Sequence, residues 1–397
     1  MTKLLPLKRI ARLQYGESLA ADQRVDGEYP VMGSGGISGT HHRANFRAPG
    51  IVVGRKGSYG SIHWASIDGF AIDTAYYIDG SCTSAHLRWL YYALQAVDLR
   101  GVSQDVGVPG LSRESAYAAL IPAAPPQEQR RIADYLDTET ALIDAMQSRT
   151  RRQIAALVER LNESVRLATS IGSGARRKTG IAWMPEMNER WQLLKISHAF
   201  RTGSGTTPTS DRSEYFDGPH PWVNSADLND GEIIRTEKSV TTEALSDFSS
   251  LKIHPAGSLV VALYGQGSTK GKVGILRIDA CLNQACCALI PIGPISEDYA
   301  SYWFRGHKQG IVGLALGAGQ PNLSQDLIRQ LRIPAPDRPE QDQIVAELHE
   351  LEEETRTKLK LLRAREQLLS ERRAALITAA IAGQIDISTA SGRGIED

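Results

Sequence analysis

The sequence predicts an α+β protein in which two mixed α/β domains, each with a bent β-sheet, alternate with two long helices that form an antiparallel coiled coil. Three observations predict this fold class. The chain has 397 residues, more than one hydrophobic core usually organises. A set of residues recurs at a fixed separation of 212 positions. Two long stretches lack glycine and carry narrow apolar stripes with helical spacing.

The repeat relates the two halves of the chain without a gap. The paired positions are Gly107 and Gly319, Pro109 and Pro321, Leu111 and Leu323, Ser112 and Ser324, Ile121 and Ile333, Pro122 and Pro334, Ala123 and Ala335, Glu128 and Glu340, Gln129 and Gln341, Ile132 and Ile344, Leu136 and Leu348, and Leu157 and Leu369. Earlier parts match more loosely, as FAIDTA at 70–75 and ACLNQA at 280–285 do. We expect the halves to share one architecture and to be related by a pseudo-two-fold axis.

The order of the parts is therefore domain, helix, domain, helix. The predicted parts are a first mixed domain at 1–120, a first long helix at 121–172, a second mixed domain at 173–335 with a lead-in at 173–192, a second long helix at 336–385, and a tail at 386–397. Because the first helix carries the chain from one domain to the other, a second helix packed on it must run back.

In the mixed domains, short β-rich segments alternate with glycine-rich turns. GIVVG at 50–54 and AYYID at 75–79 are strand candidates in the first domain, and residues 85–97 have a helical pattern. The second domain repeats this arrangement with SLVVALYG at 258–265 and KVGILRID at 272–279. A mixed domain dominated by a strongly bent sheet fits both halves.

The long helices have recognisable ends. The first is expected from Pro126, which suits a first helical turn, to about residue 170. The second is expected at 338–382, with Asp337 as its N-cap and Gly383 as the residue that ends it.

An apolar seam along each helix predicts the coiled coil. The predicted seam residues are Ile132, Leu136, Ile143, Met146, Ile154, Leu157 and Leu161 in the first helix, and Ile344, Leu348, Leu351, Leu362, Leu369 and Leu376 in the second. They follow steps of three, four and their sums, and charged residues flank them, which is typical of a coiled coil.

Three glycine-rich segments are candidates for contacting nucleic acid: GSGGISGTHHR at 33–43, GRKGSYG at 54–60 and YGQGSTKGK at 264–272. Glycine lets a backbone approach a phosphate closely, and the polar and basic side chains can reach phosphates or base edges. The alternative is that they are solvated hairpin turns. The candidate DNA-binding residues are Ser34, His41, His42, Arg43, Arg55, Lys56, Ser58, Tyr59, Ser204, Thr206, Thr207, Tyr264, Gln266, Ser268, Lys270 and Lys272.

Charge and composition restrict the function further. The 45 basic and 45 acidic residues cancel, whereas a DNA-binding protein that acts alone is usually basic. The acidic excess lies in the segment 336–397, and the two mixed domains are mildly basic. If the chain binds DNA tightly, other subunits are expected to neutralise many of the phosphates.

Several classes of protein and site are disfavoured. There is no apolar run of membrane-spanning length and no signal peptide, so a cytoplasmic protein is expected. The cysteines, Cys82, Cys281, Cys286 and Cys287, form no C-x-x-C pair, so neither a metal site nor a disulfide scaffold is expected. The sequence contains no Walker A loop, no G-x-G-x-x-G fingerprint and no N/D-P-P-F/Y methyltransferase motif.

Over nearly its whole length the chain resembles the specificity subunits of type I restriction-modification systems. The markers are G-x-P-x-L-S before each long helix, the helix starts IPAAPPQEQRRI at 121–132 and IPAPDRPEQDQI at 333–344, and the lead-in KTGIAWMPEMNERWQLLKI at 178–196. The lead-in departs from the family pattern at Thr179, where serine is usual, and at Met184, where glycine is usual.

The resemblance implies a subunit without catalytic or cofactor-binding residues of its own. Two target recognition domains would each read one half of a bipartite, asymmetric site in double-stranded DNA, and the helices would set the spacing. The family's partners are two adenine-N6 methyltransferase subunits and restriction subunits, which would bind S-adenosylmethionine, ATP and Mg²⁺. Two alternatives stay open: a methyltransferase or nuclease with an unrecognised site, and a coiled-coil scaffold without a nucleic-acid role.

Overall fold

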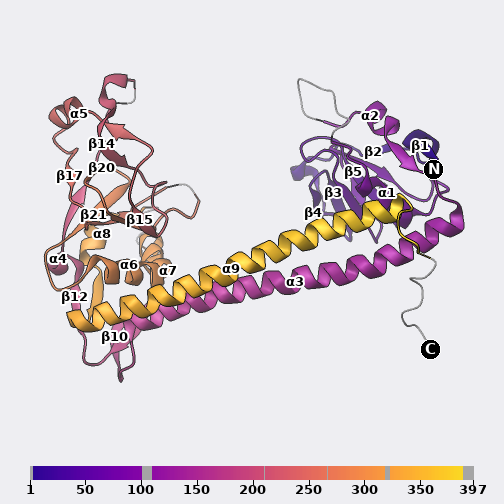
Figure 1. Cartoon of the computed structure of the whole chain (residues 1–397). Coiled ribbons are helices and arrows are strands. Elements are labelled where there is room, and N and C mark those ends of the chain that lie inside the picture. The colour runs from indigo at the N-terminus through magenta and orange to yellow at the C-terminus, as the bar shows by residue number, and fades with distance from the viewer. Residues whose placement is uncertain (1–2, 101–109, 210, 266, 318–321, 388–397) are drawn as a thin grey trace. The chain divides into compact units, whose positions relative to one another are not determined.

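The computed structural model describes residues 3–100, 110–209, 211–265, 267–317 and 322–387. The chain forms two compact units: unit 1 contains residues 1–152 and 362–397, and unit 2 contains residues 153–361. Each unit has a mixed helix-and-sheet body and part of both long helices, α3 (Pro126–Ser170) and α9 (Arg338–Ile381) (Figure 1). The predicted α+β class with two long helices is confirmed.

The body of unit 1 is made of short strands with two short helices. The strands are β1 (Leu4–Pro6), β2 (Gln14–Tyr15), β3 (Tyr29–Gly33), β4 (Gly36–His41), β5 (Gly50–Gly54), β6 (Ile62–Ala65), β7 (Phe70–Ala71), β8 (Ala75–Ile78) and β9 (Leu120–Pro122), and the helices are α1 (Leu87–Ala96) and α2 (Arg113–Ala118). The predicted strands and helix of this unit are thereby confirmed. The strands form sheets with the orders β2-β8-β5-β6, β4-β3-β7 and β1-β9.

The body of unit 2 is larger but follows the same plan. The strands are β10 (Arg176–Ile181), β11 (Met184–Asn188), β12 (Gln192–Lys195), β13 (Phe200–Ser204), β14 (Phe216–Val223), β15 (Gly231–Ile233), β16 (Ser239–Val240), β17 (Ile253–His254), β18 (Leu259–Ala262), β19 (Val273–Leu276), β20 (Ala280–Leu282), β21 (Cys286–Pro291) and β22 (Arg332–Ala335), and the helices are α4 (Ile196–Ala199), α5 (Thr242–Asp247), α6 (Glu297–Gly306), α7 (Lys308–Gly317) and α8 (Gln325–Gln330). The sheet orders are β13-β21-β18-β19-β15, β16-β14-β20-β17, β12-β22 and β10-β11.

The repeat seen in the sequence is a repeat of topology. The order β2-β8-β5-β6 in unit 1 corresponds to β13-β21-β18-β19 in unit 2. In the second sheet of each unit, one parallel pair recurs as β3 with β7 and β14 with β20. In each body an early strand pairs antiparallel with the last strand, β1 with β9 and β12 with β22. The matching connectivity explains why the loosely similar parts of the halves still align.

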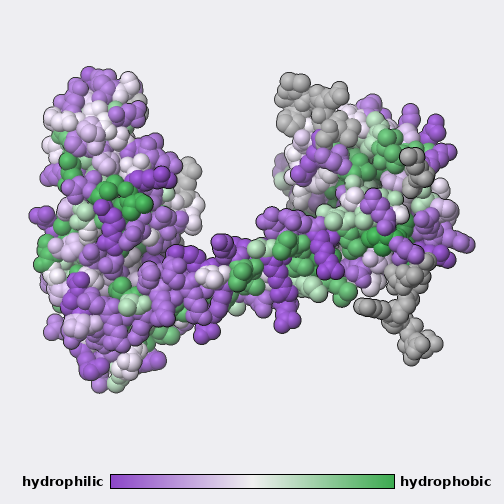
Figure 2. All heavy atoms as spheres, viewed as in Figure 1, coloured by the Kyte–Doolittle hydropathy of each residue, from purple (hydrophilic) through white to green (hydrophobic). Residues whose placement is uncertain are grey.

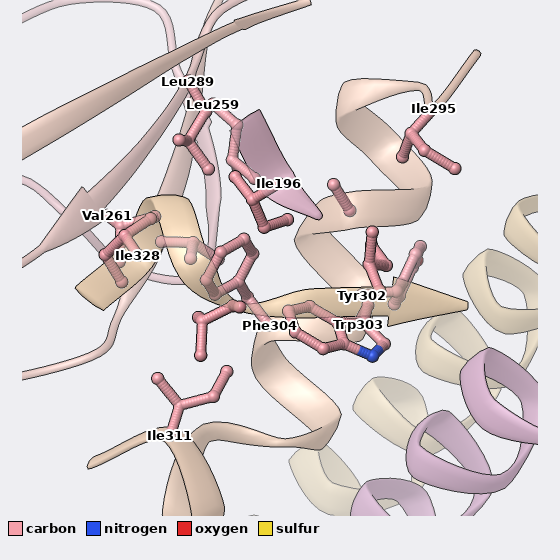
Figure 3. Close-up of a cluster of buried hydrophobic side chains, with 14 of the residues drawn as sticks. Ile196, Leu259, Val261, Leu289, Ile295, Tyr302, Trp303, Phe304, Ile311 and Ile328 are labelled. Atoms are coloured by element: carbon pink, nitrogen blue, oxygen red, sulfur yellow. The ribbon is translucent and has the colours of Figure 1, made fainter. Parts of the chain in front are cut away.

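Each half of a long helix belongs to the core of its own unit. In unit 2, Val165 of α3 and Leu348 of α9 share one core with the sheet and with α6, where Trp303 and Phe304 are fully buried (Figure 3). In unit 1, Leu136 of α3 packs in the core that contains α1. The compact units therefore divide inside the helices, whereas the sequence-based division separates helices from domains. The reason is that the same apolar face serves both the seam and the body.

The ends of α9 are formed as the sequence predicts. The Asp337 carboxylate accepts a hydrogen bond from the Glu340 N–H at 3.0 Å, which is the N-cap geometry. At the other end, Gly383 has a φ of 69° and its N–H donates to the Ala380 carbonyl at 3.2 Å. The predicted N-cap and terminating glycine are confirmed.

The helices pair antiparallel. In unit 1, Asp144 of α3 pairs with Arg373 of α9 at 3.0 Å, and Arg151, further along α3, pairs with Glu366, which comes earlier in α9. Buried seam residues are Ile132, Leu136, Ile143, Ile344, Leu348 and Leu369, and half-buried ones are Ile154, Leu157, Leu161, Leu351, Leu362 and Leu376.

One predicted seam residue is wrong. Met146 is 45% exposed, and the neighbouring Gln147 is buried in its place. The Gln147 amide donates to the Ser370 hydroxyl at 2.8 Å, so the seam contains a satisfied polar contact at this level. Alternating steps of four and three from Ile143 lead to positions 147 and 150, and Thr150 is fully buried. A search for apolar residues alone selects Met146 instead.

The recurrent glutamine of each helix start ties the long helix to the body. In unit 2 the fully buried Gln341 accepts from the Ser296 N–H at 2.9 Å and donates to the carbonyls of Pro294 and Pro336. In unit 1, Gln129 accepts from the His86 N–H and donates to the Ala124 carbonyl, both at 2.8 Å. Since Ser296 and His86 are the N-caps of α6 and α1, the repeated glutamine has a structural role in both units.

A buried histidine makes unit 2 sensitive to acid. His307 is buried, its Nε2 lies 2.8 Å from the Ser170 hydroxyl, and burial lowers its pKa to about 3. Between this pKa and the ordinary pKa of histidine, only the unfolded chain binds the proton, so stability is lost as pH falls through that window. We expect His307→Gln to weaken the acid dependence of unfolding between about pH 6.5 and pH 4. Urea unfolding at several pH values checks this, and an unchanged dependence would contradict it.

Candidate nucleic-acid interface

The β5–β6 loop of unit 1 contains the GRKGSYG segment and is held in a fixed turn. The Arg55 N–H donates to the Thr74 carbonyl at 2.8 Å, and the Arg55 carbonyl accepts from the Leu111 N–H at 2.8 Å. Gly57 has a φ of 70°, a conformation that glycine adopts without steric penalty. The loop is therefore anchored on both sides, by the loop before β8 and by the G-x-P-x-L-S segment.

The side chains of this loop differ in exposure and in their contacts with the rest of the unit. The Arg55 guanidinium lies over Tyr15, 5.0 Å from the ring centroid, and its Nη1 donates to the Asp73 carbonyl at 3.2 Å. Lys56 and Ser58 are exposed. Tyr59 is half-buried, and its carbonyl accepts from Arg100 Nε at 3.3 Å. Arg55 is thus oriented by its neighbours, whereas Lys56 and Ser58 face solvent.

The segment 33–43, expected as a loop, is the β3–β4 hairpin. The Ser34 carbonyl lies 3.0 Å from His63 Nε2 and accepts from the Ser61 hydroxyl, so Ser34 is half-buried at the turn. The two residues between the strands are Ser34 and Gly35, and β4 ends at His41. Within β4 only His41 is buried, whereas residues 37–40 are exposed.

His41 is a correction to the candidate list. It is 5% exposed, its Nδ1 accepts from the Val25 N–H at 3.3 Å, and its ring lies against Phe70 with centroids 5.2 Å apart. Burial, followed by the nearby His42 and Arg43, lowers the pKa of His41. The strand register turns His41 inward, so its side chain faces the core and not the surface that DNA would approach.

Next to the hairpin lies a polar cleft. His42 and Arg43 are exposed, and Arg43 pairs with Glu17 at 2.7 Å. The cleft has a volume of about 350 Å³ and is lined by Tyr29, His42, Arg43, Ala44, Asn45, Phe46, Arg47 and Asp79. Arg47 pairs with Asp68 at 2.7 Å, so both arginines of the cleft already have carboxylate partners.

In unit 2, Ser204 ends β13, and Thr206 and Thr207 follow it. Most hydrogen bonds of these candidates involve backbone groups. Ser204 is exposed. The Thr206 N–H donates to the Leu282 carbonyl at 3.0 Å, and its own carbonyl accepts from the Trp222 indole at 3.2 Å. The Thr207 hydroxyl donates to the Gln284 side chain. Ser204 is the member of this group whose side chain faces solvent.

The loop between β18 and β19 carries the other candidates of unit 2. Tyr264 is half-buried against the core, and burial raises its pKa. The Ser268 carbonyl accepts from Lys308 Nζ at 2.9 Å, which ties the loop to α7. Lys270 and Lys272 are half-buried. Gln266 lies outside the described residues.

The Leu-Ser end of the repeated motif makes the same contacts in both units. The Leu111 N–H donates to the Arg55 carbonyl at 2.8 Å, and the Leu323 N–H donates to the Leu263 carbonyl at 3.0 Å. In each unit the following serine then caps a short helix, as Ser112 does for α2. The motif therefore anchors the glycine-rich loop to the helical part of its unit, and Arg55 and Leu263 occupy equivalent positions.

Sequence reasoning missed two residues beside the loop of unit 1. Tyr15 ends β2 and is 43% exposed, and Arg113 starts α2 with its guanidinium 4.8 Å from the centre of the Tyr15 ring. Neither residue lies in a glycine-rich segment. Arg113 does follow Leu111 by two positions, so the repeat marks its neighbourhood, whereas nothing local in the sequence marks Tyr15.

The described residues contain neither a metal-ligand cluster nor a membrane-spanning helix. No group of three or more His, Cys, Asp or Glu side chains in these residues could hold a metal ion. Within the same residues, none of the helices is both long and apolar enough to span a bilayer.

Known proteins resemble this chain in sequence and in fold. The family model described as the type I restriction modification DNA specificity domain matches residues 188–363. The chain is 27% identical over 177 residues to the type I restriction enzyme MjaIX specificity subunit of Methanocaldococcus jannaschii, covering 43% of this chain and 39% of that protein. It is 23% identical over 322 residues to the type I restriction enzyme EcoBI specificity subunit of Escherichia coli, covering 76% of this chain and 66% of that protein.

A solved structure shares the fold. A chain from a study of complex assembly and conformational transition of the type I R-M system superposes with a TM-score of 0.67 at 15% identity, covering 96% of this chain and 98% of that one. The family match lies in the second half, and the first half repeats its Leu-Ser motif and its strand order. Residues 188–363 therefore match the type I restriction modification DNA specificity domain, and the chain is similar to type I specificity subunits over less than two thirds of their length.

Proposed function

We propose that this chain is the DNA-reading subunit of a type I restriction-modification complex, in which each unit recognises one half of a bipartite, asymmetric site in double-stranded DNA. One observation carries this proposal. The two units hold their glycine-rich loops on the same strands and with the same backbone anchors, but the side chains on those loops differ. A protein that reads two different half-sites needs two similar scaffolds that carry different contact residues.

The chemistry is assigned to partner subunits. We infer that two methyltransferase subunits and the restriction subunits bind S-adenosylmethionine, ATP and Mg²⁺, and that this chain has neither a catalytic nor a cofactor-binding residue. The near-zero net charge supports the division, because partners that contact phosphates would supply the missing positive charge.

Three exposed aliphatic residues on the helices of unit 1 are the ones we assign to contact with a methyltransferase subunit. Leu142 and Met146 of α3 are one turn apart and are 54% and 45% exposed, and Leu368 of α9 is 64% exposed. Figure 2 shows hydrophobic side chains at the surface of the helix pair. Large aliphatic side chains on an otherwise charged helix pair favour burial against a partner.

Salt-dependent binding tests the proposal. The full chain, assembled with its methyltransferase subunits, should bind one duplex sequence with an affinity that falls steeply as salt rises. Binding that ignores sequence, or no binding, would favour a scaffold without a nucleic-acid role. Turnover of S-adenosylmethionine by the chain alone would instead make it an enzyme.

The β5–β6 loop gives a first mutational test. We expect Arg55→Ala combined with Lys56→Ala to lower the methylation rate of the target at limiting DNA by about tenfold, because two cations that can reach phosphates are removed. Lys8→Ala combined with Arg9→Ala, a pair of exposed cations of the same unit outside the glycine-rich loops, serves as the control. Equal effects of the two double variants would remove this loop from the proposed DNA surface.

A further inference from the structure

We infer that Tyr15, Arg55, Lys56 and Arg113 of unit 1 form a binding site for a phosphodiester group of DNA. This inference rests on the proposed function and gives it a named contact site. The four residues come from β2, the β5–β6 loop and the start of α2. They are far apart in sequence, and the fold brings them together.

The cluster is built around one aromatic ring. The guanidinium carbons of Arg55 and Arg113 lie 5.0 and 4.8 Å from the centroid of the Tyr15 ring. Arg55 also lies 5.9 Å from the ring of Tyr76, which is buried and whose hydroxyl donates to the Leu111 carbonyl at 3.0 Å. The attraction between a cation and a ring face orients both guanidinium groups before any ligand arrives.

Within the described residues, these two arginines make only part of the hydrogen bonds that their guanidinium groups could make. Arg55 donates from Nη1 to the Asp73 carbonyl at 3.2 Å, and the Nε of Arg113 is buried with no partner among the described residues. A guanidinium has five N–H donors, and a buried donor without an acceptor is costly. The cluster therefore has several donors to offer to a ligand that carries acceptor oxygens.

The charge of the cluster is also not neutralised within the described part of the chain. Arg55, Lys56 and Arg113 form no ion pair there, whereas Arg43, Arg47 and Arg88 of the same unit pair with Glu17, Asp68 and Asp137. Two guanidinium groups that share one aromatic ring without a paired carboxylate, with Lys56 next to Arg55 in the chain, favour an anion. Planar guanidinium groups can bind two oxygens of a phosphate at once, which fits a phosphodiester of the DNA backbone.

The loop that carries two of the cations is fixed at the backbone. Arg55 is anchored through its carbonyl by Leu111, and Lys56 forms an isolated antiparallel bridge with Gly110. A phosphate contact that is already in place loses little conformational entropy on binding. The site is therefore preorganised rather than assembled by the ligand.

Unit 2 has positions equivalent to those of the cluster, but no cationic side chains occupy them. Gly16 and Gly205 are equivalent, since a Cβ on either would clash with a backbone carbonyl, that of Ile72 or that of Leu282. Ser204 thus stands where unit 1 has Tyr15, and Gln325, 212 positions after Arg113, donates instead to the Thr202 hydroxyl at 2.7 Å. At the positions of Arg55 and Lys56, unit 2 has Leu263 and Tyr264. The fold does not need the cationic cluster, which points to a ligand-binding role specific to unit 1.

The test uses the full chain assembled with its methyltransferase subunits and a duplex that contains the recognised site. Arg113→Gln introduces the residue of unit 2 and removes one charge. We expect the slope of log affinity against log salt to become shallower by about one, the affinity near 0.1 M salt to fall about tenfold, and the recognised sequence to stay the same. Arg113→Lys keeps the charge and should keep the slope.

Two controls separate the outcomes. Gln325→Ala, at the equivalent position of unit 2, should leave the slope unchanged, and thermal unfolding shows whether Arg113→Gln is folded. An unchanged salt slope for folded Arg113→Gln would overturn the inference. A relaxed sequence preference at the wild-type slope would also overturn it, because that result indicates a base contact. If Arg113→Gln does not fold, Tyr15→Ser must give the lower affinity. A wild-type complex that binds no specific duplex would defeat the proposed function itself.

Discussion

Replacement of Gln341 by leucine is expected to lower the free energy of unfolding of unit 2 by about 3 kcal/mol or more. The side chain is fully buried and makes three hydrogen bonds, to the Ser296 N–H and to the Pro294 and Pro336 carbonyls. Leucine has a similar volume but leaves all three backbone groups without this partner. Each buried group that loses its hydrogen bond costs about 1–3 kcal/mol.

Urea unfolding followed by tryptophan fluorescence measures this effect, because unit 2 contains four of the chain's six tryptophans: Trp183, Trp191, Trp222 and Trp303. Gln343→Leu, an exposed glutamine on the same helix, should change stability by less than about 0.5 kcal/mol. If both variants unfolded at the same urea concentration, Gln341 would not be the connection between α9 and the body of unit 2.

The second large effect is expected in the seam of unit 1. Leu369→Glu should destabilise this unit by several kcal/mol, because Leu369 is 9% exposed and a carboxylate there would be buried without a partner. Glu366, one turn earlier, already pairs with Arg151, so the new charge would also be close to an existing negative charge.

The adjacent residue supplies a matched control. Leu368 is 64% exposed and is one of the three residues assigned to contact with a methyltransferase subunit. Leu368→Glu should leave the thermal unfolding of the chain nearly unchanged but weaken assembly with that subunit. The opposite pattern, a large loss of stability for Leu368→Glu and a small one for Leu369→Glu, would mean that the seam runs along a different face of α9.

Much of the fold could be predicted because its signals are local or repeated. The ends of α9 follow from Asp337 and Gly383, whose capping chemistry depends only on neighbouring residues. The repeat predicted that the halves would share one plan, and the strand orders do. The role of Gln129 and Gln341 could not be predicted, since each bonds a backbone N–H that lies 43 or 45 residues away in the sequence.

The candidate site was less predictable because it depends on register and on distant contacts. His41 was assigned to a loop, but it ends β4 and the strand turns its ring into the core. Met146 was chosen over Gln147 because apolar character, and not helical phase, guided the assignment. Tyr15 and Arg113 were missed because no sequence pattern connects β2 with the start of α2.

A map of modified adenines in DNA from cells that carry the complete system tests the central claim most directly. Two dissimilar reading units in one chain predict a single asymmetric motif made of two defined segments separated by unspecified bases. Exchange of the body of unit 1 for that of a relative should change one segment and leave the other as it was. A continuous motif, or an exchange that altered both segments together, would contradict the account.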